Sequence, residues 1–304
     1  MALRDIAIVG TAQRPSEVNS TFTSVEILLP VIQQLLDKVG IERSDIGFWC
    51  HGSCDYMSGQ PFSFVSAVDA IGAENVHAIM MPYQFTSDMS LTDSELQAET
   101  QGVEFSSIDI HSMVDSFNLS LSDQFRNTSR DTTEENIQSR VRGTLLMALS
   151  NKSHKLVLAT GNKSEMAVGY ATLYGDMCGG FAPLKDISKT MVYQLAKYRN
   201  TLSDVIPERV ITRPPSAELA PDQVDQDSLP SYDILDDILM RFVEQKQSVN
   251  EIIENGHNSE DVIKITSLIL RNEYKRRQSA PGPKISSNAF GKERRYPMTS
   301  KFKP

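Results

Sequence analysis

The chain has 304 residues, of which 40% are hydrophobic and 23% charged, and its formal net charge is −9. These values are ordinary for a globular protein with one large or two medium domains, and the acidic balance argues against general nucleic-acid binding. No apolar run reaches the roughly 18 residues of a membrane span, and the first residues lack the pattern of a secretory signal. Three cysteines are too few for a disulfide framework, so we expect a cytoplasmic protein with no membrane or nucleic-acid partner.

The first elements alternate apolar runs with loop-forming residues. Residues 6–10 predict a buried strand, and the apolar residues of 24–39 recur at helical spacing until Gly40. A second strand is predicted at 46–49. Residues 50–63 are rich in Gly, Ser and Pro, which predicts a loop.

From residue 64 onward the pattern alternates regularly between helix and strand. The elements predicted there are helices at 64–71, 91–101 and 133–150 and strands at 76–81, 105–110 and 155–159. This order predicts a parallel sheet with helices on both faces and a ligand site at the carboxyl ends of the strands. The proline-rich, acidic stretch 213–231 predicts an extended loop, and amphipathic helices are predicted at 232–246 and 259–274.

The segment 155–189 carries the densest set of candidate site residues. A strand is expected to end at Thr160 and a helix to open around Glu165, so that backbone amides could approach a phosphate or an adenine. Glu165 could hold Mg²⁺ or a ribose hydroxyl, and a glycine-rich loop with Asp176 follows. The alternative is a helix N-cap and a glycine-rich connection without a ligand.

Basic residues dominate the chain from Arg271 onward. One interpretation is a solvated terminus. The other is that this tail folds back and neutralises a phosphorylated ligand, because Lys and Arg side chains bind phosphate oxygens.

Several long segments occur together, in this order, in one known family. They include AIMMPYQFTSDMS, EENIQSRVRGTLLMALSN, TGNKSEMAVGYATLYGDMCGGFAPLKD and RPPSAELAPDQVDQDSLPSYDILD. Residues 74–304 resemble the synthetase domain of glutamine-dependent NAD(+) synthetases. The resemblance implies an α/β fold, a Rossmann-like parallel sheet of the adenine-nucleotide alpha-hydrolase-like type with flanking helices. It also implies a carbon–nitrogen ligase that needs ATP and Mg²⁺, converts deamido-NAD and ammonia into NAD through an adenylated intermediate, and forms a homo-oligomer.

The resemblance further implies roles for individual residues. The implied ATP contacts are Thr160 and Ser216, the implied catalytic pair near the reacting phosphates is Asp176 and Lys189, and the implied deamido-NAD contacts are Asn136, Arg140, Glu165 and Lys275. Glu165 is also the implied metal ligand. The match at Lys275 favours the ligand-facing interpretation of the basic tail.

Residues 1–73 depart from that pattern. ALRDIAIVGTAQRP, GIERSDIGFWCHGSCDYMSG and QPFSFVSAVDAIGA resemble the start of a thiolase-like, lipid-transfer-associated acetyl-CoA acetyltransferase. We therefore expect a thiolase-like fragment at 1–73 fused to an NAD synthetase catalytic domain at 74–304. Cys50 and Cys54 lack the second ligand pair that a zinc site needs.

The expected pyrophosphate loop is also replaced. The family has Ser-Gly-Gly-x-Asp-Ser where this chain has YMSGQPFS, and Pro61 removes an amide donor where donors should cradle pyrophosphate. The amidase domain that supplies ammonia from glutamine is expected to be absent as well. The sequence leaves two alternatives: an active NAD synthetase, or a catalytically inactive chimeric remnant that binds nucleotides.

Overall fold

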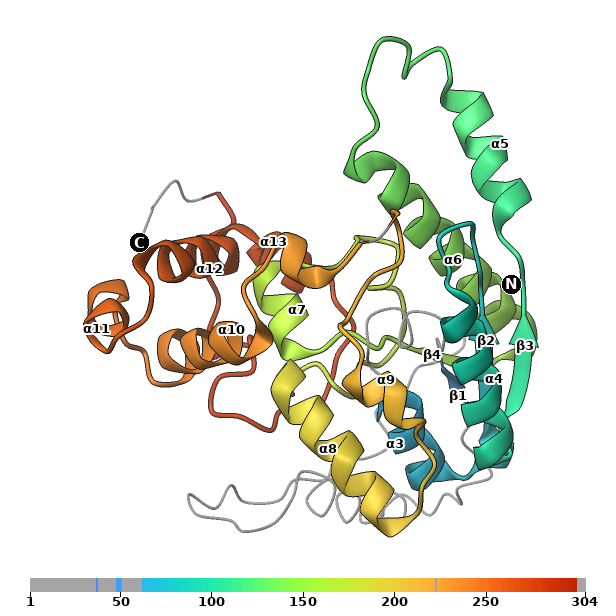
Figure 1. Ribbon diagram of the computed structural model, residues 1–304, viewed down its shortest axis with the longest axis horizontal. Coiled ribbons are helices and arrows are strands. Elements are labelled where there is room, and N and C mark those ends of the chain that lie inside the picture. Colours follow the sequence, from blue (N-terminus) through green and yellow to red (C-terminus); the bar gives the residue numbers. More distant parts are fainter. Residues whose placement is uncertain (1–36, 38–47, 51–61, 222, 300–304) are drawn as a thin grey trace.

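The structure, a computed structural model, describes residues 37, 48–50, 62–221 and 223–299 (Figure 1). The described residues form a parallel four-stranded sheet in the order β3-β2-β1-β4. Its strands are β1 (Phe48–Cys50), β2 (Val76–Met80), β3 (Glu104–Ser107) and β4 (Leu156–Leu158). The predicted parallel sheet is therefore confirmed.

Helices cover both faces of this sheet. The covering helices are α3 (Phe62–Ile71), α8 (Lys189–Leu202) and α9 (Glu208–Thr212) on one face and α5 (His111–Leu121) and α6 (Thr132–Ser153) on the other. Successive residues of a strand point to opposite faces, so Ala78 of β2 packs with the first group and Ile79 with the second. α4 (Asp88–Gln101) packs against β2 and β3.

A second hydrophobic cluster lies beside the sheet and is mostly helical. It is built by α7 (Lys163–Val168), α10 (Tyr232–Leu239), the π-helical η4 (Met240–Glu244), α11 (Val249–Glu254) and α12 (Ser259–Arg271). α13 (Glu273–Arg276) follows directly. Figure 1 shows this lobe at the left, with α7 between it and the sheet. After α7 the chain returns to the sheet as α8 and α9 before it enters the lobe again at α10.

Most boundaries agree with the predicted ones, and the differences have local causes. α4 begins before residue 91 because the Ser87 side chain caps it, accepting from the Ser90 N–H. α5 was not predicted, and neither were α8, α9 and α11. Val114 is the one buried residue of α5. The short helices η2 (Ala73–Asn75) and η3 (Asp225–Asp227) were not predicted either.

The remaining predictions concern the N-terminal residues and membrane-spanning helices. The strand predicted at 6–10 and nearly all of the helix predicted at 24–39 lie outside the described residues. Among the helices that are described, none combines the length and the apolar character needed to cross a bilayer.

Candidate functional site

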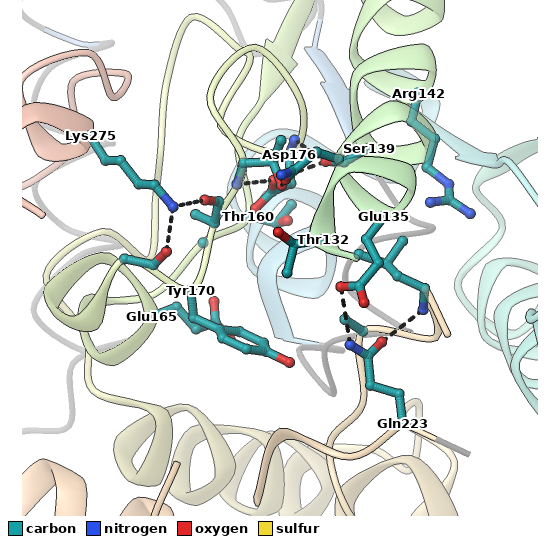
Figure 2. Close-up of a pocket in the computed structure, with 17 residues that line it drawn as sticks. Thr132, Glu135, Ser139, Arg142, Thr160, Glu165, Tyr170, Asp176, Gln223 and Lys275 are labelled. Carbon is teal, nitrogen blue, oxygen red and sulfur yellow. Dashed lines mark hydrogen bonds between the residues drawn. The ribbon is translucent and has the colours of Figure 1, made fainter. Parts of the chain in front are cut away.

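A cavity of about 290 Å³ lies beyond the carboxyl end of β4 (Figure 2). One side is the first half of α6, and the other holds the turn into α7, residues 169–172 and Lys275. Residues of the segment 213–224 close it from a third direction. The cavity therefore lies at the edge of the sheet where the strands end, which is where a ligand site is expected in a parallel sheet.

The chain leaves β4 and enters α7 through a reciprocal capping box. The Asn162 side chain accepts a hydrogen bond from the Glu165 N–H at 2.9 Å, and the Glu165 carboxylate accepts from the Asn162 N–H at 3.3 Å. This box fixes Thr160 and Glu165, and both line the cavity. The N-cap and the ligand-facing interpretation are therefore compatible, since the same turn serves both.

A buried network of charges lies behind Glu165. Lys189 has no exposed side-chain surface, and its Nζ lies 3.1 Å from Glu165 Oε1. Burial raises the pKa of Glu165, against the opposing effect of Lys189, and the nearby Asp225 raises it further. Burial alone would lower the pKa of Lys189, but Glu165 and Asp225 raise it. Lys189 therefore stays protonated and supports Glu165 from behind.

The glycine-rich connection after α7 packs directly on α6. Asp176 accepts hydrogen bonds from Ser139 Oγ at 3.1 Å and from the Thr172 N–H at 2.7 Å, and its own N–H donates to Ser139 Oγ at 3.0 Å. A Cβ on Gly175 would lie 2.1 Å from Ser139 Oγ, so only glycine permits this approach. Burial raises the pKa of Asp176.

The start of the basic tail reaches the cavity. Lys275 donates from Nζ to the carbonyls of Gly169 and Ala171, each at 2.7 Å, while lining the cavity. Burial lowers the pKa of Lys275; Asp176 opposes this change and the neighbouring Arg140 adds to it. This part of the tail is not a solvated terminus.

Comparisons with known proteins identify the family of this chain. A family model described as NAD synthase matches residues 59–279. The chain belongs to the NAD synthase family. It is 61% identical over 240 residues to a glutamine-dependent NAD(+) synthetase of Acinetobacter baylyi, covering 78% of this chain and 44% of the relative. It is 45% identical over 292 residues to the enzyme of that name from Aquifex aeolicus, covering 95% of this chain and 50% of the relative.

A solved structure gives the same assignment. The glutamine-dependent NAD+ synthetase of Acinetobacter baumannii, solved in complex with ADP, matches with a TM-score of 0.56 and 49% identity, over 93% of this chain and 51% of that one. The chain thus spans about half the length of these glutamine-dependent relatives.

The comparisons do not support the thiolase-like assignment of residues 1–73. The NAD synthase match begins at residue 59, and the Aquifex relative aligns with 95% of the chain. In the structure, β1 lies in the sheet between β2 and β4, and α3 packs in the same core as α8 and α9. The segment 56–63, which we expect in place of the pyrophosphate loop, lies outside the described residues except for Phe62 and Ser63 at the start of α3. Cys54 lies outside them as well.

The structure brings together five of the eight residues that the NAD synthetase resemblance singles out. These are Asn136, Thr160, Glu165, Asp176 and Lys275, which all line the cavity. Ser216 is adjacent to the lining residue Ala217 and donates to the Gln223 carbonyl. Arg140 is exposed at the rim and donates to the Leu173 carbonyl at 3.2 Å. The expected pair of Asp176 and Lys189 is divided between two networks, because Lys189 contacts Glu165 and Asp176 contacts Ser139.

Other lining residues were missed from the sequence. Thr132 and Ser139 lie four residues before and three after Asn136, so helical spacing would have found them. Arg142 extends that face and donates from Nε to the Met81 carbonyl at 3.0 Å. Gln223 lies in an irregular segment, where no periodic signal exists.

Proposed function

We propose that this chain converts deamido-NAD to NAD by ATP-dependent amidation through an adenylated intermediate. The observation that carries the proposal is the cavity at the end of β4, where five residues implied by the NAD synthetase resemblance converge. A carboxylate is a poor acyl electrophile, so its activation as a mixed anhydride with AMP must precede attack by ammonia. Little covalent chemistry then falls to the protein, whose task is to position the substrates and neutralise charge.

The polar groups of the cavity suit an anionic dinucleotide. The positive charges of Lys275 and Arg140 lie close enough to repel each other. An anion bound beside them would reduce this repulsion. Asn136 accepts from the Thr172 hydroxyl through Oδ1 at 2.8 Å, so its amide nitrogen is available to donate. We assign these three side chains to the phosphates and the carboxylate of deamido-NAD.

The strand end and the segment beside it suit ATP. Thr160 and Gly161 line the cavity where β4 stops, and Ser216 stands next to it. Among the described residues no group of three or more acidic, His or Cys side chains could hold a metal ion. Mg²⁺ commonly takes one or two carboxylates together with substrate phosphates. Glu165 fits as a single carboxylate ligand of an Mg²⁺ ion that arrives with ATP, where the ion would neutralise phosphate charge.

Two assignments follow for the expected catalytic pair. Asp176 faces the cavity and lies near Lys275, so it can orient that ammonium toward the ligand. Lys189 does not line the cavity, and we propose that it acts by holding the carboxylate of Glu165 in place.

The test is turnover by the purified chain with ATP, Mg²⁺, deamido-NAD and ammonium chloride. We expect NAD, measured by enzymatic reduction to NADH, and AMP in equal amounts. Lys275→Met should raise the KM for deamido-NAD, whereas Lys264→Met, at an exposed lysine of α12, should leave it unchanged. Binding of deamido-NAD by calorimetry without NAD or AMP formation at saturating ammonium would instead support the inactive remnant, which the SGQPFS segment favours.

A further inference from the structure

The segment 213–224, which the structure describes except for residue 222, forms one wall of the cavity, and its described residues adopt neither helix nor strand. Ala217, Leu219 and Gln223 contribute the lining. An irregular segment has no ladder of backbone hydrogen bonds, so its shape depends on whichever side chains hold it. Those side chains therefore decide whether this wall exists before a substrate binds.

Glu218 anchors the segment at the N-terminus of α4. Its Oε1 accepts from the hydroxyls of Ser87 and Ser90, each at 2.8 Å, and its Oε2 accepts from the Ser87 N–H at 3.1 Å. Arg213 Nη1 lies 4.0 Å from Oε1 and donates to Ser90 Oγ at 3.0 Å. The carboxylate also meets the positive end of the dipole of α4. Glu218 lies 131 positions from Ser87 and 128 positions from Ser90 in the chain.

The backbone at this anchor is strained, and the neighbouring residue is held as well. Glu218 has a φ of 47°, in the left-handed region that residues with a Cβ rarely occupy. The carbonyl of Leu219 accepts from the buried Gln138 of α6 at 2.9 Å, and its N–H donates to Gln223 Oε1 at 2.9 Å. The wall is thus fixed between α4 and α6.

We propose that Glu218 is a positioning residue that preforms this wall of the substrate cavity by clasping the N-terminus of α4. Glu218 does not line the cavity itself. Its effect on substrate is therefore indirect and passes through its neighbours Ala217 and Leu219, which line the cavity. The kinetic part of this proposal rests on the proposed function, whereas the clasp can be tested without any substrate.

The first measurement is amide hydrogen exchange on the full chain without ligands, followed by mass spectrometry. In Glu218→Ala, peptides from 213–224 should exchange about tenfold faster or more, because several hydrogen bonds to a charged group are lost. Peptides from β2 and the second half of α6 should keep their wild-type rates. Ser90→Ala, changed on the opposite side of the clasp, should also speed exchange in 213–224. Glu208→Ala, at an exposed glutamate nearby in the chain, is the matched control and should have no effect.

The second measurement separates positioning from a purely structural role. In Glu218→Ala the KM for deamido-NAD should rise about tenfold with kcat within about threefold of the wild type, and Glu218→Asp should restore part of the difference. If the wild-type chain proves inactive, the dissociation constant of deamido-NAD takes the place of KM, so that failure of the proposed function leaves this test intact. Wild-type exchange in both Glu218→Ala and Ser90→Ala would overturn the clasp. Faster exchange with unchanged KM or affinity would overturn the positioning role.

Discussion

Lys189→Met removes a buried ammonium and leaves a side chain of similar length. The two opposite charges are 3.1 Å apart and attract by about 5 kcal/mol at an effective dielectric constant of about 20. The folded variant can avoid part of that loss by protonating Glu165. Protonating a carboxyl with an unfolded-state pKa near 4.3 costs about 3 to 4 kcal/mol at pH 7. Burial raises the pKa of Glu165 in the wild type as well, so part of this cost is already present there. We therefore expect the free energy of unfolding to fall by about 1 to 3 kcal/mol at pH 7.

The loss should depend on pH with a defined sign. Burial already raises the pKa of Glu165 against the effect of Lys189, and removing Lys189 raises it further. The folded variant then holds a proton that the unfolded chain releases above a pH of about 4.3, so stability is lost as the pH rises from there toward 7. At pH 5 the difference from the wild type should shrink to below about 1 kcal/mol.

Urea unfolding followed by circular dichroism at pH 5, 6 and 7 measures these differences. The double variant Lys189→Met/Glu165→Gln should come within about 1 kcal/mol of Glu165→Gln alone, because no unneutralised buried carboxylate remains at position 165. Lys264→Met is the exposed control. A loss below about 1 kcal/mol at pH 7, or one that is the same at every pH, would refute this account of the pair.

Two other variants change buried residues that do not line the cavity. Gly175→Ala places a Cβ 2.1 Å from Ser139 Oγ and should lower the free energy of unfolding by about 1 to 3 kcal/mol, measured by thermal or urea unfolding. The control is Gly161→Ala, whose new Cβ would have its nearest contact at 3.6 Å and which should cost less stability. Equal losses in the two variants would contradict the packing argument. Tyr232→Phe removes a hydroxyl that donates to Asp225 Oδ2 at 2.7 Å and should cost about 1 to 3 kcal/mol. Because burial raises the pKa of Tyr232, the folded state keeps a proton that the unfolded chain loses above a pH of about 10, so stability falls there as pH rises. The fall in stability above a pH of about 10 should be less steep in Tyr232→Phe than in the wild type. An unchanged dependence of stability on pH in this range would contradict the role given to Tyr232.

The sheet and the strand end of the site were predictable because their signals are local. All five residues of β2 are buried, and all but His77 are apolar, so a nearly continuous apolar run marks the strand. α6 opens with a capping box at Asp131 and Glu134, which a sequence displays within four positions. The turn after β4 combines both kinds of signal, and Thr160 and Glu165 were found there. Parallel strands place such a turn at the ligand edge of the sheet.

The other walls could not be predicted from local signals. Glu218 meets Ser87 across 131 positions and Lys275 meets Gly169 across 106, and no spacing rule connects residues so far apart. The burial of a charged side chain was equally difficult to predict from the sequence. Lys189, at the first position of α8, has the sequence character of a solvated lysine, yet it has no exposed side-chain surface because Glu165 neutralises it. The family resemblance singled out Lys189 and Lys275 but not Glu218, and the contacts of all three emerge only from the fold.

The position of α7 explains why the basic tail matters to the cavity beyond its charge. α7 has six residues, too few for an isolated helix to be stable in water. At its C-terminal end the carbonyls of Ala167, Val168 and Gly169 accept from side chains of residues 276, 272 and 275 in turn, at 2.8, 2.8 and 2.7 Å. The other end of α7 presents Thr160 and Glu165 to the cavity. Since the tail holds one end of this helix and the cavity uses the other, changes at Asn272 or Arg276 should weaken substrate binding even though neither residue lines the cavity.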